Sequence, residues 1–503
     1  MSLTQPPKST PEPQQKSSSS QSSSNQNTTS QNAANSSRKL PALAVSVALT
    51  AVIALTGAWW LKGTVFRNIK GGFFRVGPLD SQPSEVDMTA GHDGSSGVSM
   101  LPGSVSGAKQ KGLDAMAAKD WATAKVEFAA ALAEKRNDPE TLIYFNNAKI
   151  GNNPAYTIAL SVPASKFSNP ALEIMRGVAQ AQNTLNQSVG INGTPLKVLL
   201  FDDQGEPEQA QEIANALAAN PNVLGVVGHY SSDTTLAAAD VYEAAGLPVI
   251  SPTSTAVNIA SAGDYVFRTV PSDRLAASTL ARHTLNTLKK KKAAVFYNSE
   301  STYSRSVKSE FATEFLSSGG DVVAEFDTAE AGFSVGNALK VAKDQEADVI
   351  MLGLTLGTVD IPIQIMAVNK RQLPIVASDS LYSPRVLDIG QENALGMTVA
   401  VPWHTLSHAQ SAFVGTAQTL WGGDVNWRTA MAYDAAMTLA TGIGTEPTRV
   451  GVAETLANPG FTATGATDDV RFFPSGDRNQ PSQLVKVVKG NRTSSGYEFA
   501  PVE

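Results

Sequence analysis

The sequence predicts an α/β protein with two doubly wound parallel-sheet lobes that are joined by hinge strands. Short apolar runs alternate with helix-like runs from Asn153 onward, and the strand-like runs end in small polar clusters. This alternation is typical of parallel sheets that carry helices on both faces. A chain of 503 residues is also too long for one ordinary core. Because a single sheet would need too many strands, we expect two.

The strands and helices of this domain can be placed from the apolar pattern. We expect strands at Tyr156–Val162, Leu196–Phe201, Val223–Val227, Pro248–Ile250, Ala293–Tyr297, Asp321–Phe326, Asp348–Leu354, Pro374–Ala377 and Met397–Val401. We expect helices between them at Ala171–Leu185, Glu206–Ala219, Thr235–Ala245, Leu275–Leu288, Tyr303–Ser317, Gly336–Asp344 and Asp360–Lys370. A late Pro-Ser-Gly-Asp turn predicts a hairpin that returns to the second lobe.

These elements predict a bilobed domain over residues 153–490. Lobe 1 would span about 153–272 and 403–468, and lobe 2 about 273–402 and 469–490. Residues 491–503 would remain as a C-terminal tail.

The residues before this domain predict a membrane tether. Residues 1–38 are rich in Ser, Gln and Asn and bury too little apolar surface to fold, so we expect them to be disordered. Leu40–Leu61 is uncharged and close to the roughly 20 apolar residues that a bilayer core requires. We therefore expect a transmembrane helix over 39–62 that acts as an uncleaved signal anchor. The alternative is a cleaved signal peptide, whose apolar region is shorter, roughly 7–15 residues.

The charges beside the apolar segment leave its orientation open. The flanking basic residues are Arg38 and Lys39 before it, and Lys62, Arg67, Lys70 and Arg75 after it. Local counting favours a cytoplasmic C-terminal side, whereas long domains often translocate regardless of flanking charge.

Two further segments separate the membrane helix from the bilobed domain. Residues 63–107 predict a linker rich in Gly, Ser and Pro. Residues 108–152 predict helices in a pattern similar to one tetratricopeptide (TPR) repeat, carried by Gly112, Ala115, Trp121, Ala124, Phe128, Ala131 and Pro139. A lone repeat lacks stacking neighbours, so we favour a helical spacer packed on the next domain over a peptide-binding module.

The composition excludes several classes of function. The chain has no cysteine, which excludes disulfides, thiol catalysis, cysteine metal sites and a lipid-modified cysteine. Its net charge is −6 without a long basic run, which argues against nucleic acid as a partner. HExxH, GxSxG, phosphate-loop and GxGxxG motifs are absent, so we expect no metal, no cofactor and no enzyme. His229 beside Ser231 and Ser232 is a weak hint of nucleophile activation.

Two neighbouring strands are predicted to end in clusters of hydroxyl groups. One cluster is Tyr230-Ser231-Ser232-Asp233-Thr234, and the next is Ser251-Pro252-Thr253-Ser254-Thr255. Ligands of open parallel sheets bind at the carboxyl ends of strands, where the first N–H groups of the following helix attract anions. The clusters therefore predict a site for a small carboxylate, and plain N-capping of the helices is an equally good alternative.

Two residues of the second lobe could complete such a site. Asp379 follows the predicted strand Pro374–Ala377 and would complement an ammonium group across the cleft, or else caps a turn. Tyr303 begins a predicted helix and would either stack over the ligand or pack in the core. Tyr230, Tyr382 and Trp403 are candidates for the pocket wall.

These motifs, in this order, resemble a known family. GHYSSDTTLAAADVYEAAGLPVISPTSTA, VFYNSESTYSRSVKSEF, IVASDSLYSP and MAYDAAMTLA are similar to the type I periplasmic binding proteins. The likeness is greatest to the branched-chain amino acid (Leu/Ile/Val) binding proteins of ABC transporters. It covers about Asn153 to Lys489 and implies a Venus-flytrap fold.

The resemblance also implies roles for individual residues. It places the ligand's α-carboxylate at Ser232 and Thr255, its ammonium at Asp379, and Tyr303 as the aromatic residue at the start of the interlobe helix. Asp233 stands where many relatives have Ser, and its charge would disfavour a bound carboxylate unless it points into the helix turn. The predicted ligand-binding residues are Tyr230, Ser231, Ser232, Thr253, Ser254, Thr255, Tyr303 and Asp379.

The sequence thus predicts a membrane-anchored solute-binding protein that captures a small amino acid or related amide. It would present this ligand to an ABC permease from the periplasmic side of a bacterial inner membrane, with Leu40–Leu61 as the anchor. The alternative is a ligand-sensing receptor or scaffold subunit that works with a sensor partner instead of a transporter.

Overall fold

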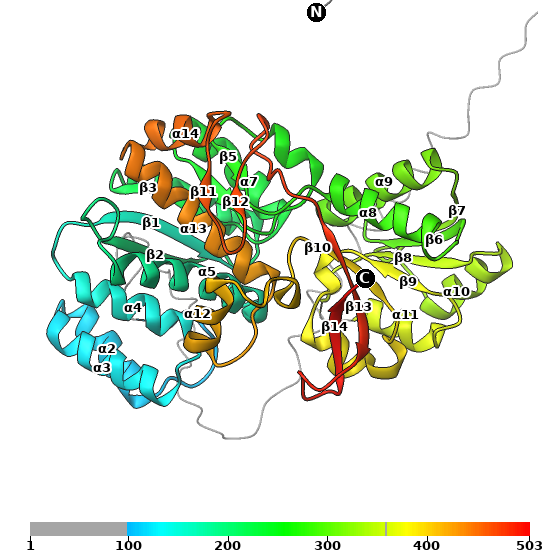
Figure 1. Ribbon diagram of the computed structural model, residues 1–503, viewed down its shortest axis with the longest axis horizontal. Coiled ribbons are helices and arrows are strands. Elements are labelled where there is room, and N and C mark those ends of the chain that lie inside the picture. Colours follow the sequence, from blue (N-terminus) through cyan, green and yellow to red (C-terminus); the bar gives the residue numbers. More distant parts are fainter. Residues whose placement is uncertain (1–97, 358–359, 503) are drawn as a thin grey trace, which may run out of the picture. The chain divides into compact units, whose positions relative to one another are not determined.

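The computed structural model describes residues 98–357 and 360–502 (Figure 1). These residues belong to one compact unit, Ser84–Glu503. The predictions for 1–38, 39–62 and most of the linker lie outside the described residues. Within the described ranges, no helix has the length and apolarity that a membrane crossing needs.

The first lobe is built on a fully parallel sheet of five strands in the order β2-β1-β3-β4-β5. These strands are β1 (Tyr156–Val162), β2 (Leu196–Asp202), β3 (Val223–Val227), β4 (Val249–Ser251) and β5 (Val266–Arg268). The helices of this lobe are α5 (Ser168–Gln187), α6 (Pro207–Ala219), α7 (Ser232–Ala244), α12 (Ala412–Trp421), α13 (Trp427–Thr445) and α14 (Arg449–Ala457) (Figure 1). Since helices cover both faces, the strands are apolar along most of their length.

The second lobe is built on a sheet of seven strands in the order β14-β13-β10-β9-β8-β6-β7. These strands are β6 (Lys292–Tyr297), β7 (Asp321–Asp327), β8 (Val349–Gly353), β9 (Ile375–Ala377), β10 (Thr398–Val401), β13 (Gln483–Lys489) and β14 (Tyr497–Pro501). Its α-helices are α8 (Asp273–Asn286), α9 (Thr302–Ser317), α10 (Val335–Asp344) and α11 (Ile361–Asn369). Strands β6–β10 are parallel, and β13 and β14 add an antiparallel edge. The prediction of two doubly wound sheets is confirmed.

Short elements complete the described fold. A small antiparallel pair is formed by β11 (Ala463–Thr464) and β12 (Asp469–Val470). The remaining short helices are η1 (Val257–Ser261), η2 (Asp379–Leu381), η3 (Val386–Gly390), η4 (Gln391–Asn393) and η5 (Thr405–His408).

Three strands differ from the sequence prediction. β5 and β11 were not expected, because strands of three and two residues show no periodicity. Residues 491–503 were predicted to be a tail, but Tyr497–Pro501 form the edge strand β14, in which Phe499 lies opposite Val487. The apolar signal of this strand is short, and only its pairing with β13 defines it.

The chain passes between the two sheets at 269–272, 402–411 and 471–482. The second of these passages returns the chain to the first lobe, where α13 packs along α5 (Figure 1). The third leads to β13 and returns it to the second lobe. The lobes are therefore composed of segments that are distant in sequence.

Three helices precede β1: α2 (Gly107–Ala117), α3 (Trp121–Glu134) and α4 (Pro139–Ile150). The buried ammonium of Lys109 lies 2.9 Å from Asp138 and 2.6 Å from Glu140. Glu140 also accepts hydrogen bonds from the Ser99 hydroxyl and the Met100 N–H, which attaches residues 99–100 to this helical segment.

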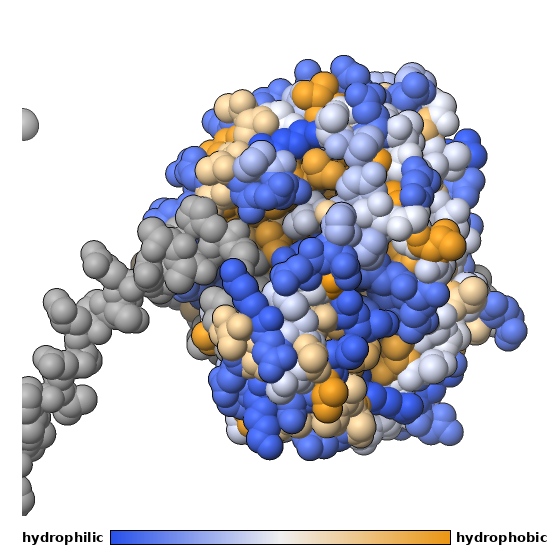
Figure 2. All heavy atoms as spheres, turned by 90° about the vertical axis from the view of Figure 1, so that its left-hand side faces the viewer, coloured by the Kyte–Doolittle hydropathy of each residue, from blue (hydrophilic) through white to orange (hydrophobic). Residues whose placement is uncertain are grey.

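Helix α4 joins the helical segment to the first lobe. The Asn147 side chain donates to the Val198 carbonyl at 2.7 Å and accepts from the Val198 N–H at 3.2 Å, so it extends the edge of β2. A packed helical spacer agrees with these contacts, and the tetratricopeptide interpretation stays a prediction. Figure 2 shows the face at this end, where hydrophilic residues separate the apolar ones, as is usual for water-exposed protein surface.

The α5–α13 contact is close enough to test the packing of the first lobe. A Cβ atom at Gly177 would lie 2.6 Å from the backbone nitrogen of Tyr433 and would also meet the Thr429 carbonyl. We expect Gly177→Ala to lower the free energy of unfolding by about 1–3 kcal/mol, because two backbones must separate. Urea unfolding of the purified protein measures this change.

The matched control is Gly415→Ala in α12, where a Cβ would meet nothing within 4 Å. There we expect a stabilisation of about 0.5–1 kcal/mol from helix propensity alone. Equal effects of the two substitutions would contradict the close contact.

Candidate functional site

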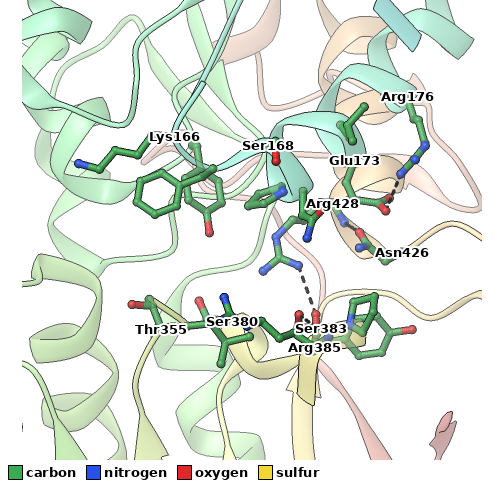
Figure 3. A pocket seen from close by; sticks show the side chains of 18 residues that line it. Lys166, Ser168, Glu173, Arg176, Thr355, Ser380, Ser383, Arg385, Asn426 and Arg428 are labelled. Atoms are coloured by element: carbon green, nitrogen blue, oxygen red, sulfur yellow. Dashed lines mark hydrogen bonds and ion pairs between the residues drawn. The ribbon is translucent and has the colours of Figure 1, made fainter. Parts of the chain in front are cut away.

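A cleft between the two lobes opens into an outer cavity of about 420 Å³. Figure 3 shows two groups of side chains that face each other across this space. The first group comes from the starts of α5 and α13 and contains Lys166, Ser168, Glu173, Arg176, Asn426 and Arg428. The second group comes from the loops after β8 and β9 and contains Thr355, Ser380, Ser383 and Arg385. Both lobes thus contribute side chains to one space.

A smaller, deeper cavity of about 60 Å³ adjoins the outer one. Tyr230, Thr355, Ser380 and Arg428 line both cavities. Six of the predicted site residues line the deep cavity: Tyr230, Ser231, Ser232, Thr253, Tyr303 and Asp379. The two hydroxyl clusters and the second-lobe acid are therefore brought together.

The first hydroxyl cluster both caps α7 and leaves N–H groups available. Ser231 is the N-cap, and its hydroxyl accepts from the Thr234 N–H at 3.1 Å within a capping box. The Ser232 hydroxyl accepts from the Ala256 N–H at 3.3 Å. The N–H groups of Ser232 and Asp233, in the first turn, have no acceptor inside the helix. N-capping explains Ser231, and the start of α7 still offers donors to the cavity.

The second hydroxyl cluster divides between the cavity and the interior. Thr253 lines the deep cavity, and its hydroxyl donates to the Tyr230 carbonyl at 2.7 Å. Ser254 instead bonds the Thr235 hydroxyl at 2.8 Å. Thr255, which the resemblance placed at the carboxylate, is buried outside the lining of the two cavities, and its carbonyl accepts from the Asp273 N–H at 2.9 Å. Neighbouring residues of this cluster therefore point in different directions, and only Thr253 among these three lines the deep cavity.

Asp379 and Tyr303 form a buried pair on the second-lobe side. The Tyr303 hydroxyl lies 2.7 Å from the Asp379 carboxylate and 2.6 Å from the Ser378 hydroxyl, so its one proton can serve only one of them. Burial raises the pKa of the Asp379 carboxyl, while the Tyr303 hydrogen bond and the charge of Arg428 lower it. Tyr303 thus both lines the cavity and orients the acid.

Asp233 does not point into its own helix turn. Its carboxylate accepts the Thr302 N–H at 3.2 Å, at the first turn of α9. The negative charge thereby interacts favourably with the N-terminus of a helix of the other lobe, which offsets part of its repulsion toward a carboxylate in the deep cavity that Asp233 also lines.

The sequence analysis missed Arg428, which lines both cavities from the first turn of α13. Its side chain is buried, and its guanidinium donates to the Tyr382 carbonyl at 3.4 Å. The guanidinium carbon lies 4.3 Å from the centre of the Trp427 ring. A cation in the first turn of a helix opposes the helix dipole, and this signal was available from the sequence.

His229 does not face the serines beside it. Its Nδ1 lies 2.7 Å from the Asp203 carboxylate and its Nε2 lies 2.9 Å from the Tyr242 hydroxyl. Both ring nitrogens are therefore engaged away from Ser231 and Ser232, and the hint of nucleophile activation is wrong.

The other aromatic and histidine candidates lie apart from the deep cavity. Tyr382 lines the outer cavity, but Trp403 is fully buried against His408 and Phe413. His404 is four residues from His408, and its Nδ1 accepts from the Leu406 N–H. In the part of the chain that the structure describes, no cluster of three His, Cys, Asp or Glu residues could hold a metal ion.

Comparison with known proteins agrees with this geometry. Residues 157–495 match the model of a family described as periplasmic binding protein. The chain belongs to this family. It is 36% identical over 126 residues to an amino acid binding protein of Pseudomonas aeruginosa, covering 25% of this chain and 34% of that protein. It is 32% identical over 174 residues to the leucine-, isoleucine-, valine-, threonine- and alanine-binding protein of the same species, covering 34% and 46%.

Solved structures show the same fold. An ABC transporter substrate-binding protein from Desulfitobacterium hafniense, in complex with Leu, has a TM-score of 0.59 and 23% identity, and covers 69% of this chain and 100% of that one. The resemblance to branched-chain amino acid binding proteins of ABC transporters is confirmed. The chain spans less than half the length of the two Pseudomonas relatives that it matches.

Asp273 yields a test of the buried charges near the cleft. Burial raises the pKa of its carboxyl from 3.8 to about 7, against a hydrogen bond from Ser306, and the charge of Asp379 adds to the increase. Between these values the folded state holds a proton that the unfolded state has lost, so the stability falls as the pH rises. Asp273→Asn removes this titration. We expect its advantage over the wild type in unfolding free energy to grow by up to about 1.4 kcal/mol per pH unit.

Urea unfolding at about pH 4, 5.5 and 7 measures the trend across the window set by these values. The control is Asp240→Asn, an exposed position on α7, which we expect to leave the pH dependence unchanged. If Asp273→Asn and the wild type keep a constant difference, Asp273 does not titrate in this range.

Proposed function

We propose that this protein is a solute-binding protein that captures a small amino acid between its lobes and presents it to an ABC permease. The observation that carries the proposal is the deep cavity, which is lined by the start of α7 from one lobe and by Asp379 from the other. A zwitterionic amino acid has a carboxylate for the start of α7 and an ammonium group for Asp379. The family membership and the printed functions of the relatives support this assignment.

The ligand would be held by partial charges at one end and a full charge at the other. Its α-carboxylate would meet the free N–H groups of Ser232 and Asp233 and the residues Tyr230 and Thr253. Its ammonium would meet Asp379, whose carboxylate Tyr303 orients. Ser231 would act indirectly, through the capping box that fixes the start of α7.

Binding would favour a closed arrangement of the lobes. A ligand that contacts both lobes gains its full set of bonds only when they approach, so it shifts the population toward closure. The permease would then distinguish the closed, loaded protein from the empty one.

We further propose that Leu40–Leu61 anchors the protein in the inner membrane with the binding domain on the periplasmic side. Support comes from the uncharged, apolar character of this segment, which lies outside the described residues, and from the family. We expect deletion of residues 40–61 to move the protein from the membrane fraction to the soluble fraction, measured by fractionation and immunoblotting. A full-length chain that is soluble without detergent would contradict the anchor.

Asp379→Asn tests the ammonium site with almost no change in shape. We expect amino acid affinity to fall by at least about 100-fold, because the ligand's ammonium would be buried without a counter-charge. Isothermal titration calorimetry with the twenty amino acids measures the loss. The unliganded melting temperature should hold or rise, because a buried carboxylate is removed.

Asp344→Asn on α10 is the control, because Asp344 is exposed and pairs with Lys340 on the same helix. It should bind as the wild type does. Unchanged affinity in Asp379→Asn would refute the ammonium role.

A further inference from the structure

Arg428 is a buried cation that forms no salt bridge among the described residues, and the Asp379 carboxylate acts on it only as a nearby charge. The residue is only 6% exposed, its Nε has no hydrogen-bond partner, and the one hydrogen bond described for its side chain is a long contact to the Tyr382 carbonyl. The other basic residues of the outer cavity are paired. Arg176 lies 2.6 Å from Glu173, Arg385 lies 2.6 Å from Asp360, and Lys166 pairs with Glu206.

The acids nearest to this cleft form no salt bridge with Arg428, and their oxygen atoms accept hydrogen bonds from other groups. Asp233 accepts the Thr302 N–H, and Glu173 accepts from both Arg176 and the Thr429 hydroxyl. Asp273 is outside the lining of the two cavities. The charges of Asp379 and Arg428 attract each other, but the ligand's ammonium would take over this carboxylate.

A bound neutral amino acid would leave the guanidinium of Arg428 without a direct carboxylate partner in the closed cleft. Its ammonium would pair with Asp379 and its α-carboxylate with the N–H groups at the start of α7, so neither group is left for Arg428. A buried, unpaired charge is costly, whereas a guanidinium that meets a carboxylate through two parallel hydrogen bonds is among the stronger polar pairs. The geometry favours a ligand that brings a second anionic group.

Resting on the proposed function, we propose that the ligand is an acidic amino acid whose side-chain carboxylate binds the guanidinium of Arg428. Arg428 lines both cavities, and Figure 3 shows it in the lining of the outer one. A side chain that extends from the deep cavity toward the outer one would therefore pass Arg428. The Trp427 ring lies against the guanidinium and helps to orient it. The cleft would thus recognise three charged groups of the ligand: the α-carboxylate, the ammonium group and, through Arg428, the side-chain carboxylate.

The test compares acidic amino acids with their amides, which have nearly the same shape. We expect calorimetry on the wild type to show glutamate or aspartate binding at least about 100-fold more tightly than glutamine, asparagine and leucine. Arg428→Met should remove this preference, lowering the affinity for the acid about 100-fold and for the amide less than about tenfold. Arg274→Met on α8 removes the same charge at an exposed site outside both cavities and should keep the wild-type preference.

Two binding results would contradict the inference of an acidic ligand and leave the proposed function standing. One is a wild type that binds an amide or leucine as tightly as the acid. The other is an Arg428→Met protein that loses acid and amide equally, which would place Arg428 at the α-carboxylate. If no amino acid binds to the wild type, the proposed function itself fails.

The conservative variant Arg428→Lys guards against a folding defect in Arg428→Met. It keeps the charge and loses the planar fork, so we expect a reduced but measurable preference for the acid. A full wild-type preference in a folded Arg428→Met protein would also refute the role of the guanidinium.

Discussion

The start of α7 and the Asp379 carboxylate line one small cavity from opposite lobes, and the remaining features of the cleft follow from this opposition. Both groups occupy the carboxyl ends of strands in parallel sheets, where helices begin and where backbone donors are exposed. The capping box of Ser231 fixes one side, and the Tyr303 hydroxyl fixes the other. Neither lobe has both halves of the proposed site, so a ligand that contacts both halves would link its binding to the approach of the lobes.

The cleft contains buried charged residues whose desolvation destabilises the folded protein. Burial raises the pKa of Asp379 and of Asp273, and Arg428 has little polar compensation for its desolvation. Polar groups that are left without partners in a low-dielectric space are costly, and a matching ligand removes that cost. In the proposed function, these unfavourable desolvation costs would be a source of selectivity, because a ligand that lacks a matching group would leave them in place.

The distribution of the chain between the lobes constrains how they can move. Three passages connect the sheets, and α13 carries Arg428 into the cleft while it packs along α5 through Gly177. The helical segment before β1 adds to the first lobe, since Asn147 binds the edge of β2. The first lobe together with this helical segment therefore contains more of the described residues than the second lobe.

The sequence by itself determined the architecture of two doubly wound sheets, and the strands and helices that it predicted have bounds within three residues of the observed ones, although α12, α13 and α14 were not among them. It did so because apolar periodicity and turn residues are local signals. It also indicated the two hydroxyl clusters and Asp379, since all three follow strands. Only the tertiary structure decided that Thr253 and not Thr255 lines the deep cavity, that β14 is an edge strand, and that Arg428 enters the cleft. These facts depend on pairing and side-chain direction between segments far apart in the chain. Local sequence marks Arg428 as an unusual cation at the start of a helix, but it does not encode that Arg428 faces the cleft.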